Sequence, residues 1–344
     1  MTTLALLLLL SPFARADDSA ITFRADPRLE AVGAAELALG GKARGFVNPK
    51  DEYSRKVAAR LKPFADHPAL KLQAGFPKAF IFADRDDIAD RLTADLHSTT
   101  DYFLPDPTTS LAGGVDKVEA WLAALRDLSA KADLPGLFEA ERAGLDARAE
   151  PFRKSAEDAR VVQTMEEYAG RRFDGVYRVT VSPFMDEERM LDSVWRRPDG
   201  TRELHTVVGA SAGRRHTDYY FKERFPTALW HQLAHGLFDE KVEAARADLE
   251  TRTDGRREPC FGAWEQCVKE NLVRAVTARL MEKAAGPRAA KRFLNNGDEG
   301  LYPMMPELLK RLKEYEADRA KYPTLDAFLP RLFDAFPKKA APRP

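Results

Sequence analysis

The chain has no excess of charge of either sign, because 54 lysine and arginine residues balance 54 aspartate and glutamate residues. Proteins that bind nucleic acid or anionic membranes usually present a basic surface, so neither partner is expected here. The sequence also lacks a phosphate-binding loop, a dinucleotide-binding glycine motif and a patch of mixed basic and aromatic residues. These absences disfavour roles in nucleotide and nucleic-acid chemistry.

Long hydrophobic runs are also scarce. The only one, Leu4–Leu10, is too short to span a bilayer but matches the core of a secretory signal peptide, and Ala14-Arg15-Ala16 follows as a small-x-small cleavage site. We therefore predict a signal peptide over residues 1–16 and an exported protein, either periplasmic or secreted. No cysteine follows the run, so no membrane anchor is expected. A short buried helix is the alternative, since no basic residue precedes Leu4.

Cysteine is nearly absent: Cys260 and Cys267 are the only two, and both lie in the segment PCFGAWEQC. Two cysteines cannot form a zinc site by themselves. In an exported protein an even number of cysteines is consistent with a disulfide, but two buried thiols explain the pair equally well. No functional role is assigned to them.

The composition is that of a folded protein. With 344 residues, 44% hydrophobic and 31% charged, the chain can form one large or two medium domains, and it contains no internal repeat or low-complexity linker. Apolar residues at three- and four-residue spacing predict helices in the first half of the chain. The predicted segments are residues 51–64, 78–97, 115–132 and 134–168.

Alternating β-branched and aromatic residues predict a small sheet at residues 173–184 and 201–210, and a short strand near the N-terminus at residues 20–25. Helical patterns then return. They begin near Pro226 and continue through residues 262–282, 303–319 and 324–336. The predicted fold class is therefore α+β, mostly helical, with a small sheet.

His231 and His235 are the strongest candidates for chemistry. Their four-residue spacing on a predicted helix places both imidazoles on one face, within reach of a single ion. Glu270, on a later helix, would complete a ligand set of two histidines and one carboxylate, which is the set of one class of catalytic zinc site. Two alternatives stay open at this point: the histidines could be packed in the core, and Glu270 could form a helix-surface salt bridge with Arg274.

The segments WHQLAHGLFDE, WEQCVKENLVRAV and GLYPMMPELLKRLKEYEADRAKYPTLDAFLPRL resemble successive blocks of a family of secreted bacterial proteins that carry a zincin-like domain of unknown function. The resemblance extends over about residues 25–338. It implies a gluzincin-type metallopeptidase fold with an active-site helix, and one Zn²⁺ per chain held by His231, His235 and Glu270. The change from helical to strand patterns near Arg171 places the division between a mainly helical N-terminal region (17–170) and the zincin-like domain (171–338).

Two residues depart from the family pattern. Gln232 stands where the family has the glutamate that takes a proton from zinc-bound water, and an amide is no base near pH 7. Asn271 stands where the family often has histidine, in the shell behind the metal ligands together with Arg274. Asp239 and Glu240 are candidates for a substitute base, but one turn beyond His235 they are expected to face solvent.

Other residues are candidates by type only. Tyr302, Tyr219, Tyr220 and His216 could stabilise a transition state, with Tyr302 as the first choice. Gly209-Ala210-Ser211-Ala212-Gly213 fits the nucleophile elbow of a serine hydrolase, but the alternating strands and helices of that fold do not precede it, and a turn rich in small residues explains it.

The sequence therefore predicts an exported, zinc-binding, catalytically impaired metallopeptidase homologue that binds a peptide or protein. An active zinc hydrolase with a non-standard base is the first alternative, and a serine hydrolase that uses Ser211 is the second. The oligomeric state cannot be derived from the sequence.

Overall fold

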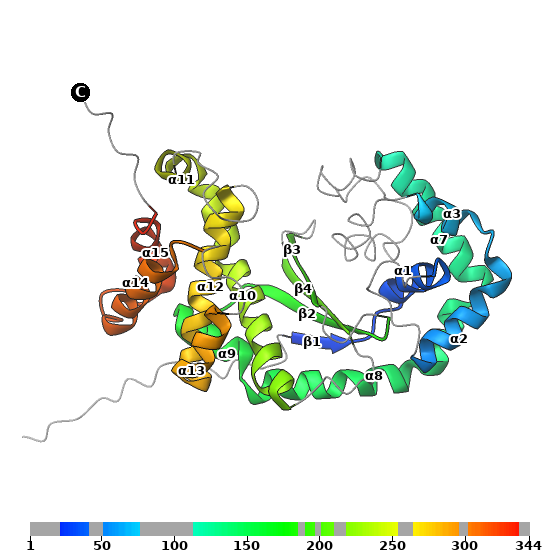
Figure 1. The fold of residues 1–344 in the computed structure, drawn as a ribbon, viewed down its shortest axis with the longest axis horizontal. Helices are drawn as coiled ribbons and strands as arrows, with labels where there is room; N and C mark the ends of the chain where they lie inside the picture. Colours follow the sequence, from blue (N-terminus) through cyan, green and yellow to red (C-terminus); the bar gives the residue numbers. More distant parts are fainter. Residues whose placement is uncertain are drawn as a thin grey trace, which may run out of the picture.

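A computed structural model describes residues 21–40, 51–75, 113–184, 190–196, 201–209, 218–253, 264–295 and 302–336. Within these ranges the protein is mostly helical and contains one small sheet (Figure 1). The predicted α+β class is confirmed. The predicted signal peptide and the predicted helix at residues 78–97 lie outside the described residues.

The sheet has four strands in the order β1-β2-β4-β3. Strands β1 (Ile21–Arg24), β2 (Gly175–Ser182) and β4 (Arg202–Gly209) are parallel, and the edge strand β3 (Met190–Arg196) runs antiparallel to β4. The three predicted strand segments correspond to β1, β2 and β4. β3 was not predicted as a separate strand. Because β1 pairs with β2, the N-terminal end of the described chain is part of the same sheet as residues 175–209.

Both faces of the sheet are covered. On one face Tyr177, Val179 and Leu204 are fully buried in a hydrophobic cluster. On the other face most of the buried side chains are polar: Arg178 forms an ion pair with Glu203 at 3.1 Å, and Thr180 and His205 form a hydrogen bond. Burial on both faces is typical of parallel strands.

The helices surround this sheet. They are Pro27–Ala38 (α1), Glu52–Leu61 (α2), Lys62–Phe64 (η3), Pro68–Ala74 (α3), Val115–Lys131 (α7), Leu134–Asp158 (α8), Val161–Ala169 (α9), Tyr220–Arg224 (η4, a π-helix), Phe225–Ala244 (α10), Arg246–Thr253 (α11), Trp264–Ala285 (α12), Pro287–Leu294 (α13), Met305–Ala317 (α14) and Leu325–Phe333 (α15).

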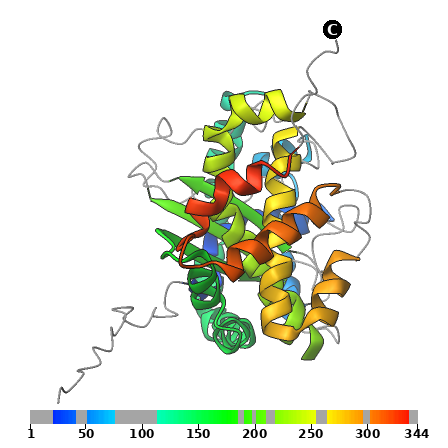
Figure 2. The same cartoon turned by 90° about the vertical axis from the view of Figure 1, so that its left-hand side faces the viewer.

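Helices α8 and α10 contact the sheet directly. α8 packs against β1 and β2, and α10 packs against β4 and β3. α12 lies beside α10, and α14 and α15 form the outer layer on the far side of α12 (Figures 1 and 2). Among the described helices, none combines the length and the apolar character that crossing a membrane requires.

The buried side chains form two hydrophobic clusters that are both continuous with α8. Leu137 and Leu145 belong to the cluster built with α1, α2, α3 and α7, whereas Phe152 and Ala156 belong to the cluster built with the sheet and α9–α15. α8 therefore spans both halves of the molecule (Figure 1). The domain boundary at residue 170/171 stays a prediction, but the division between the clusters falls within α8.

Gly33 on α1 lies in close contact with Phe184, two residues after the end of β2. A Cβ atom at Gly33 would lie 2.5 Å from Cδ2 of the fully buried Phe184 ring. We expect Gly33→Ala to lower the free energy of unfolding by about 1–3 kcal/mol, because overpacking outweighs the better helix propensity of alanine. Urea unfolding followed by circular dichroism measures this change.

Gly144 on α8 is the matched control for Gly33. It is exposed, and a Cβ atom there would meet nothing within 4 Å. Gly144→Ala should therefore raise the free energy of unfolding by roughly 0.5–1 kcal/mol. If Gly33→Ala, like Gly144→Ala, were more stable than the native protein, this result would contradict the close packing of α1 on Phe184.

Candidate metal centre

The candidate site is built on α10, which presents two histidines on one face. Leu229, Leu233 and Leu237 are buried and fix the rotation of the helix against the rest of the cluster. This rotation leaves His231 and His235 partly exposed on the side that meets α12. Glu270 stands on α12 and faces them.

The structure brings the three side chains together. The Nε2 atoms of His231 and His235 lie 3.2 Å apart. One carboxylate oxygen of Glu270 lies 3.3 Å from Nε2 of His235, and the other lies 3.7 Å from Nε2 of His231. Among the described residues these are the only three histidine, cysteine or acidic side chains whose ligand atoms converge in this way, within 4.8 Å of one another.

These distances fit a metal ion. With zinc–ligand bonds of about 2.0–2.1 Å, the ligand atoms of a tetrahedral site lie roughly 3.3 Å apart. The 3.2 Å between the two imidazole nitrogens and the 3.3 Å from His235 to one Glu270 oxygen agree with that edge length, and the second Glu270 oxygen lies 3.7 Å from His231. The donor set of two imidazoles and one carboxylate is one that zinc accepts, and three protein ligands leave a fourth position for water or a ligand.

The electrostatics of the site favour a positive charge between the three groups. Burial alone would lower the pKa of His235, but hydrogen bonds to Asp239 and Glu270 raise it to about 9. Burial and the neighbouring His235 lower the pKa of His231 to about 3. Burial would raise the pKa of Glu270, but His235 and His231 lower it to about 2. The metal-free site therefore holds a proton on His235, and this positive charge lies where a bound metal cation would lie.

Glu270 also makes the interaction with its own helix that the sequence left as an alternative. Its carboxylate accepts hydrogen bonds from Arg274 at 3.4 Å and from Gln266 at 3.1 Å, while it faces the histidines. The Arg274 guanidinium lies 4.3 Å from the centre of the Tyr302 ring. Arg274 and Tyr302 thus orient the carboxylate from behind.

The comparison with known families gives one match, to a family described as Domain of unknown function (DUF4932), over residues 40–335. The chain belongs to this family. No curated protein and no solved structure matches the chain. The description of the DUF4932 family assigns no activity, so the interpretation of the site rests on its geometry.

The sequence interpretation was wrong about Asp239. It expected this carboxylate, one turn beyond His235, to face solvent, but α10 continues to Ala244 and Asp239 is turned towards His235. Its side chain is 24% exposed, and its Oδ1 lies 3.0 Å from Nδ1 of His235. The four-residue spacing that connects His231 to His235 also connects His235 to Asp239, and this signal could have identified the residue.

Asp239 occupies the position of a carboxylate that orients a metal-binding histidine. We expect Asp239→Asn to lower zinc affinity by about 10- to 100-fold, because the carboxylate fixes the ring and makes its Nε2 a better ligand. Competition with a chelator of known affinity measures the effect. Glu243→Gln, which removes an exposed acid one turn further along α10, should leave the affinity unchanged. Equal losses in both variants would show that only the general negative charge of the helix matters.

Zinc binding should also release protons. At pH 7 the metal-free site holds a proton on His235, whose pKa is about 9, and a zinc ligand must be unprotonated. We expect about one proton released per zinc at pH 7, and an affinity that rises about tenfold per pH unit from 7 towards 9. Calorimetric titration in buffers of different ionisation enthalpy counts the protons, and His231→Ala gives the background. Binding without proton release at pH 7 would contradict this assignment.

Of the remaining candidates, some are buried in the described structure and others lie outside the described residues. Gln232 is 2% exposed on α10, and Asn271 is buried on α12, where its side chain donates to the Cys267 carbonyl and accepts from the Met304 amide. Tyr220 is buried against Phe152. Cys267 is disulfide-bonded. Cys260, Ser211 and His216 lie outside the described residues.

A cleft of about 480 Å³ opens beside His231, a size suited to a small ligand. It lies between η4, the start of α10, α12, α13 and the first residue of β3. Its apolar lining residues are Met190, Ala228, Met281, Ala289 and Phe293. Its charged lining residues are Glu223, Arg224, Arg274 and Arg292. The edge strand β3, which the sequence interpretation did not separate, therefore contributes to the cleft.

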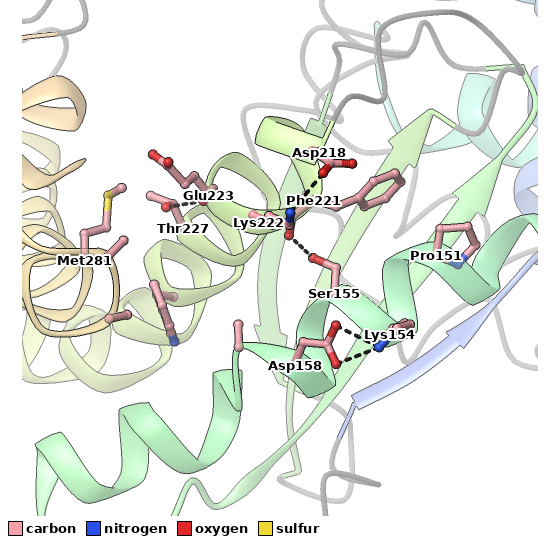
Figure 3. A pocket seen from close by; sticks show the side chains of 14 residues that line it. Pro151, Lys154, Ser155, Asp158, Asp218, Phe221, Lys222, Glu223, Thr227 and Met281 are labelled. Carbon is pink, nitrogen blue, oxygen red and sulfur yellow. Dashed lines mark hydrogen bonds and ion pairs between the residues drawn. The ribbon is translucent and has the colours of Figure 1, made fainter. Parts of the chain in front are cut away.

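A second cavity, of about 430 Å³, adjoins the first and shares Glu223, Thr227 and Met281 with it (Figure 3). Its two lysines are paired with its two aspartates: Lys154 binds Asp158, and Lys222 binds Asp218. The two cavities therefore differ in charge, although they lie side by side along η4 and α10.

Proposed function

We propose that this protein is an exported, zincin-like protein of the gluzincin type that binds one Zn²⁺ and a peptide, and that hydrolyses the peptide poorly or not at all. The convergence of His231, His235 and Glu270 within 4.8 Å is the observation that carries the proposal. Four further observations support it: the tetrahedral edge lengths, the orienting carboxylate of Asp239, the fourth position that three ligands leave, and the adjoining cleft.

The residues around the site have distinct roles in this proposal. His231, His235 and Glu270 would hold the metal, which supplies a Lewis acid that polarises a carbonyl oxygen. Asp239 holds the ring of His235, and Arg274 holds the carboxylate of Glu270. Gln232 occupies the place of the proton acceptor, but its amide takes up no proton near pH 7.

No substitute for the missing base is evident among the acids on α10. Asp239 is engaged with the Nδ1 side of His235, away from the converging Nε2 atoms. Glu240 is paired with Arg202 and half-exposed. We therefore propose that the protein is a binding protein that keeps the metal site of a peptidase.

Export is part of the proposal. The apolar run at Leu4–Leu10 supports it, and so does the disulfide at Cys267, because disulfides persist mainly in oxidising compartments.

Incubation of the zinc-loaded protein with a defined mixture of short peptides tests the proposal. Size-exclusion chromatography separates bound from free peptides, and mass spectrometry identifies both retained and cleaved ones. We expect intact peptides to be retained by the native protein and not by His231→Ala. Rapid cleavage would overturn the assignment as an impaired enzyme, and the absence of retention would overturn the peptide-binding role.

A further inference from the structure

The cleft beside His231 has a surplus of positively charged side chains, and the metal site uses only one of them. Arg224, Arg274 and Arg292 line it, and Glu223 is the only acid among its described lining residues. A cleft lined by charges of one sign concentrates the field and attracts ligands of the opposite sign. The adjoining cavity has no such surplus, because its lysines are paired with aspartates.

The three arginines are not equally available to a ligand. Arg274 is engaged by Glu270 and stacks on Tyr302, and Arg292 is paired with Glu223. Arg224 is exposed at the end of η4, and within the described part of the chain no carboxylate forms an ion pair with it. Arg224 is therefore the arginine that can receive an anionic group.

The position of Arg224 relative to His231 limits what the anionic group can be attached to. Arg224, Ala228 and His231 follow one another at four- and three-residue spacing, so they share one face of the helix, and all three line the cleft. Seven helical residues separate Arg224 from His231 by roughly 10 Å along the axis. An extended peptide advances about 3.3–3.6 Å per residue, and an arginine side chain bridges part of the distance. The anionic group of a bound peptide is therefore expected one or two residues away from the peptide group that contacts the metal.

We propose that the cleft binds a peptide carboxylate through Arg224, with the carboxylate one or two residues away from the group that contacts the metal. Guanidinium and carboxylate are matched in geometry and can form two parallel hydrogen bonds. The free C-terminus of a short peptide and an acidic side chain both supply this group. The proposal rests on the proposed function, because it takes His231 as a metal ligand.

Three zinc-binding probes test the proposal without requiring catalysis. They are mercaptoacetyl-leucyl-phenylalanine with a free carboxylate, the corresponding amide, and the amide with glutamate in place of phenylalanine. Their dissociation constants are measured by calorimetry on native protein whose zinc content is determined in the same samples. We expect at least one carboxylate probe to bind about tenfold or more tightly than the uncharged amide. Comparing the two carboxylate probes shows whether the cleft prefers a C-terminal carboxylate or an acidic side chain.

Arg224→Gln should abolish this preference while the affinity for the uncharged amide and the zinc content stay unchanged. Lys222→Gln is the matched control, because it removes a cation from the same element, η4, but on the side of the other cavity, and it should keep the preference. Equal binding of all three probes to the zinc-loaded native protein would overturn the inference and leave the proposed function intact. A preference that survives in Arg224→Gln would also overturn it. A native protein without zinc would overturn the proposed function and this inference with it.

Discussion

Replacing Gln232 with glutamate is expected to raise the rate of peptide-bond hydrolysis by the zinc-loaded protein by about 10²- to 10⁴-fold, the contribution typical of a positioned general base. Glutamate and glutamine have nearly the same shape, so the buried side chain should fit the same space on α10. The difference lies in chemistry, because a carboxylate can accept a proton from water that a metal has acidified, and an amide cannot. The measurement is the initial rate of cleavage of a quenched fluorescent peptide.

A second glutamine near the site provides the control for Gln232→Glu. Gln266 donates to Glu270 from α12, so Gln266→Glu adds a carboxylate at the site but not at the position of the base. It should not increase the rate. Comparable rates in both variants would mean that added negative charge, rather than the position of residue 232, produces the effect. A Gln232→Glu protein that binds zinc and peptide without cleaving it would contradict the role assigned to this position.

Zinc should stabilise the folded protein strongly, and the stabilisation should depend on each of the three ligands. A ligand that binds only the native state adds about 4 kcal/mol to the free energy of unfolding when its free concentration is about 1,000 times its Kd. His231→Ala and Glu270→Ala should lose nearly all of this increment, because two remaining ligands hold zinc far more weakly than three. Guanidinium unfolding with and without zinc, at fixed protein concentration, measures it.

His67→Ala is the control for this stabilisation. His67 begins α3 in the other half of the molecule, where its ring accepts from the Ala69 amide and contacts Asp127. Its removal should lower stability slightly with and without zinc, so the increment from zinc stays the same. An increment that persists in His231→Ala would place the metal elsewhere in the chain.

The local features of the site could be predicted from the sequence alone. The four-residue spacing of His231 and His235 and the apolar residues around them predicted the helix and the shared face, because helical periodicity is a local property. Glu270 followed only from the known ligand set of zinc, since nothing local connects α12 to α10. The same four-residue spacing could have identified Asp239, but its role was missed because the side chain was expected to face solvent.

The features that depend on long-range pairing could not be predicted as well from the sequence. Strand β1 pairs with β2 although Ile21 and its partner Tyr177 are 156 positions apart (177 − 21) in the chain, and periodicity carries no information about partners. β3 contains Asp192, Ser193 and Arg196, so it lacks the β-branched run that identified its neighbours. The π-helix η4 was also not predicted, because the expected helix begins near Pro226, after the last residue of η4. β3 and η4 line the cleft together with α10, α12 and α13, and for this reason the cleft emerged only from the structure.

The zinc content of the purified, untagged protein, determined by elemental mass spectrometry, decides whether His231, His235 and Glu270 form a metal centre. The account predicts close to one zinc per chain in the native protein and close to none in His231→Ala and Glu270→Ala prepared in the same way. A native protein that contains no zinc, even after incubation with the metal and removal of the excess, would contradict it. His231, His235 and Glu270 would then form a buried network around a proton rather than a metal centre.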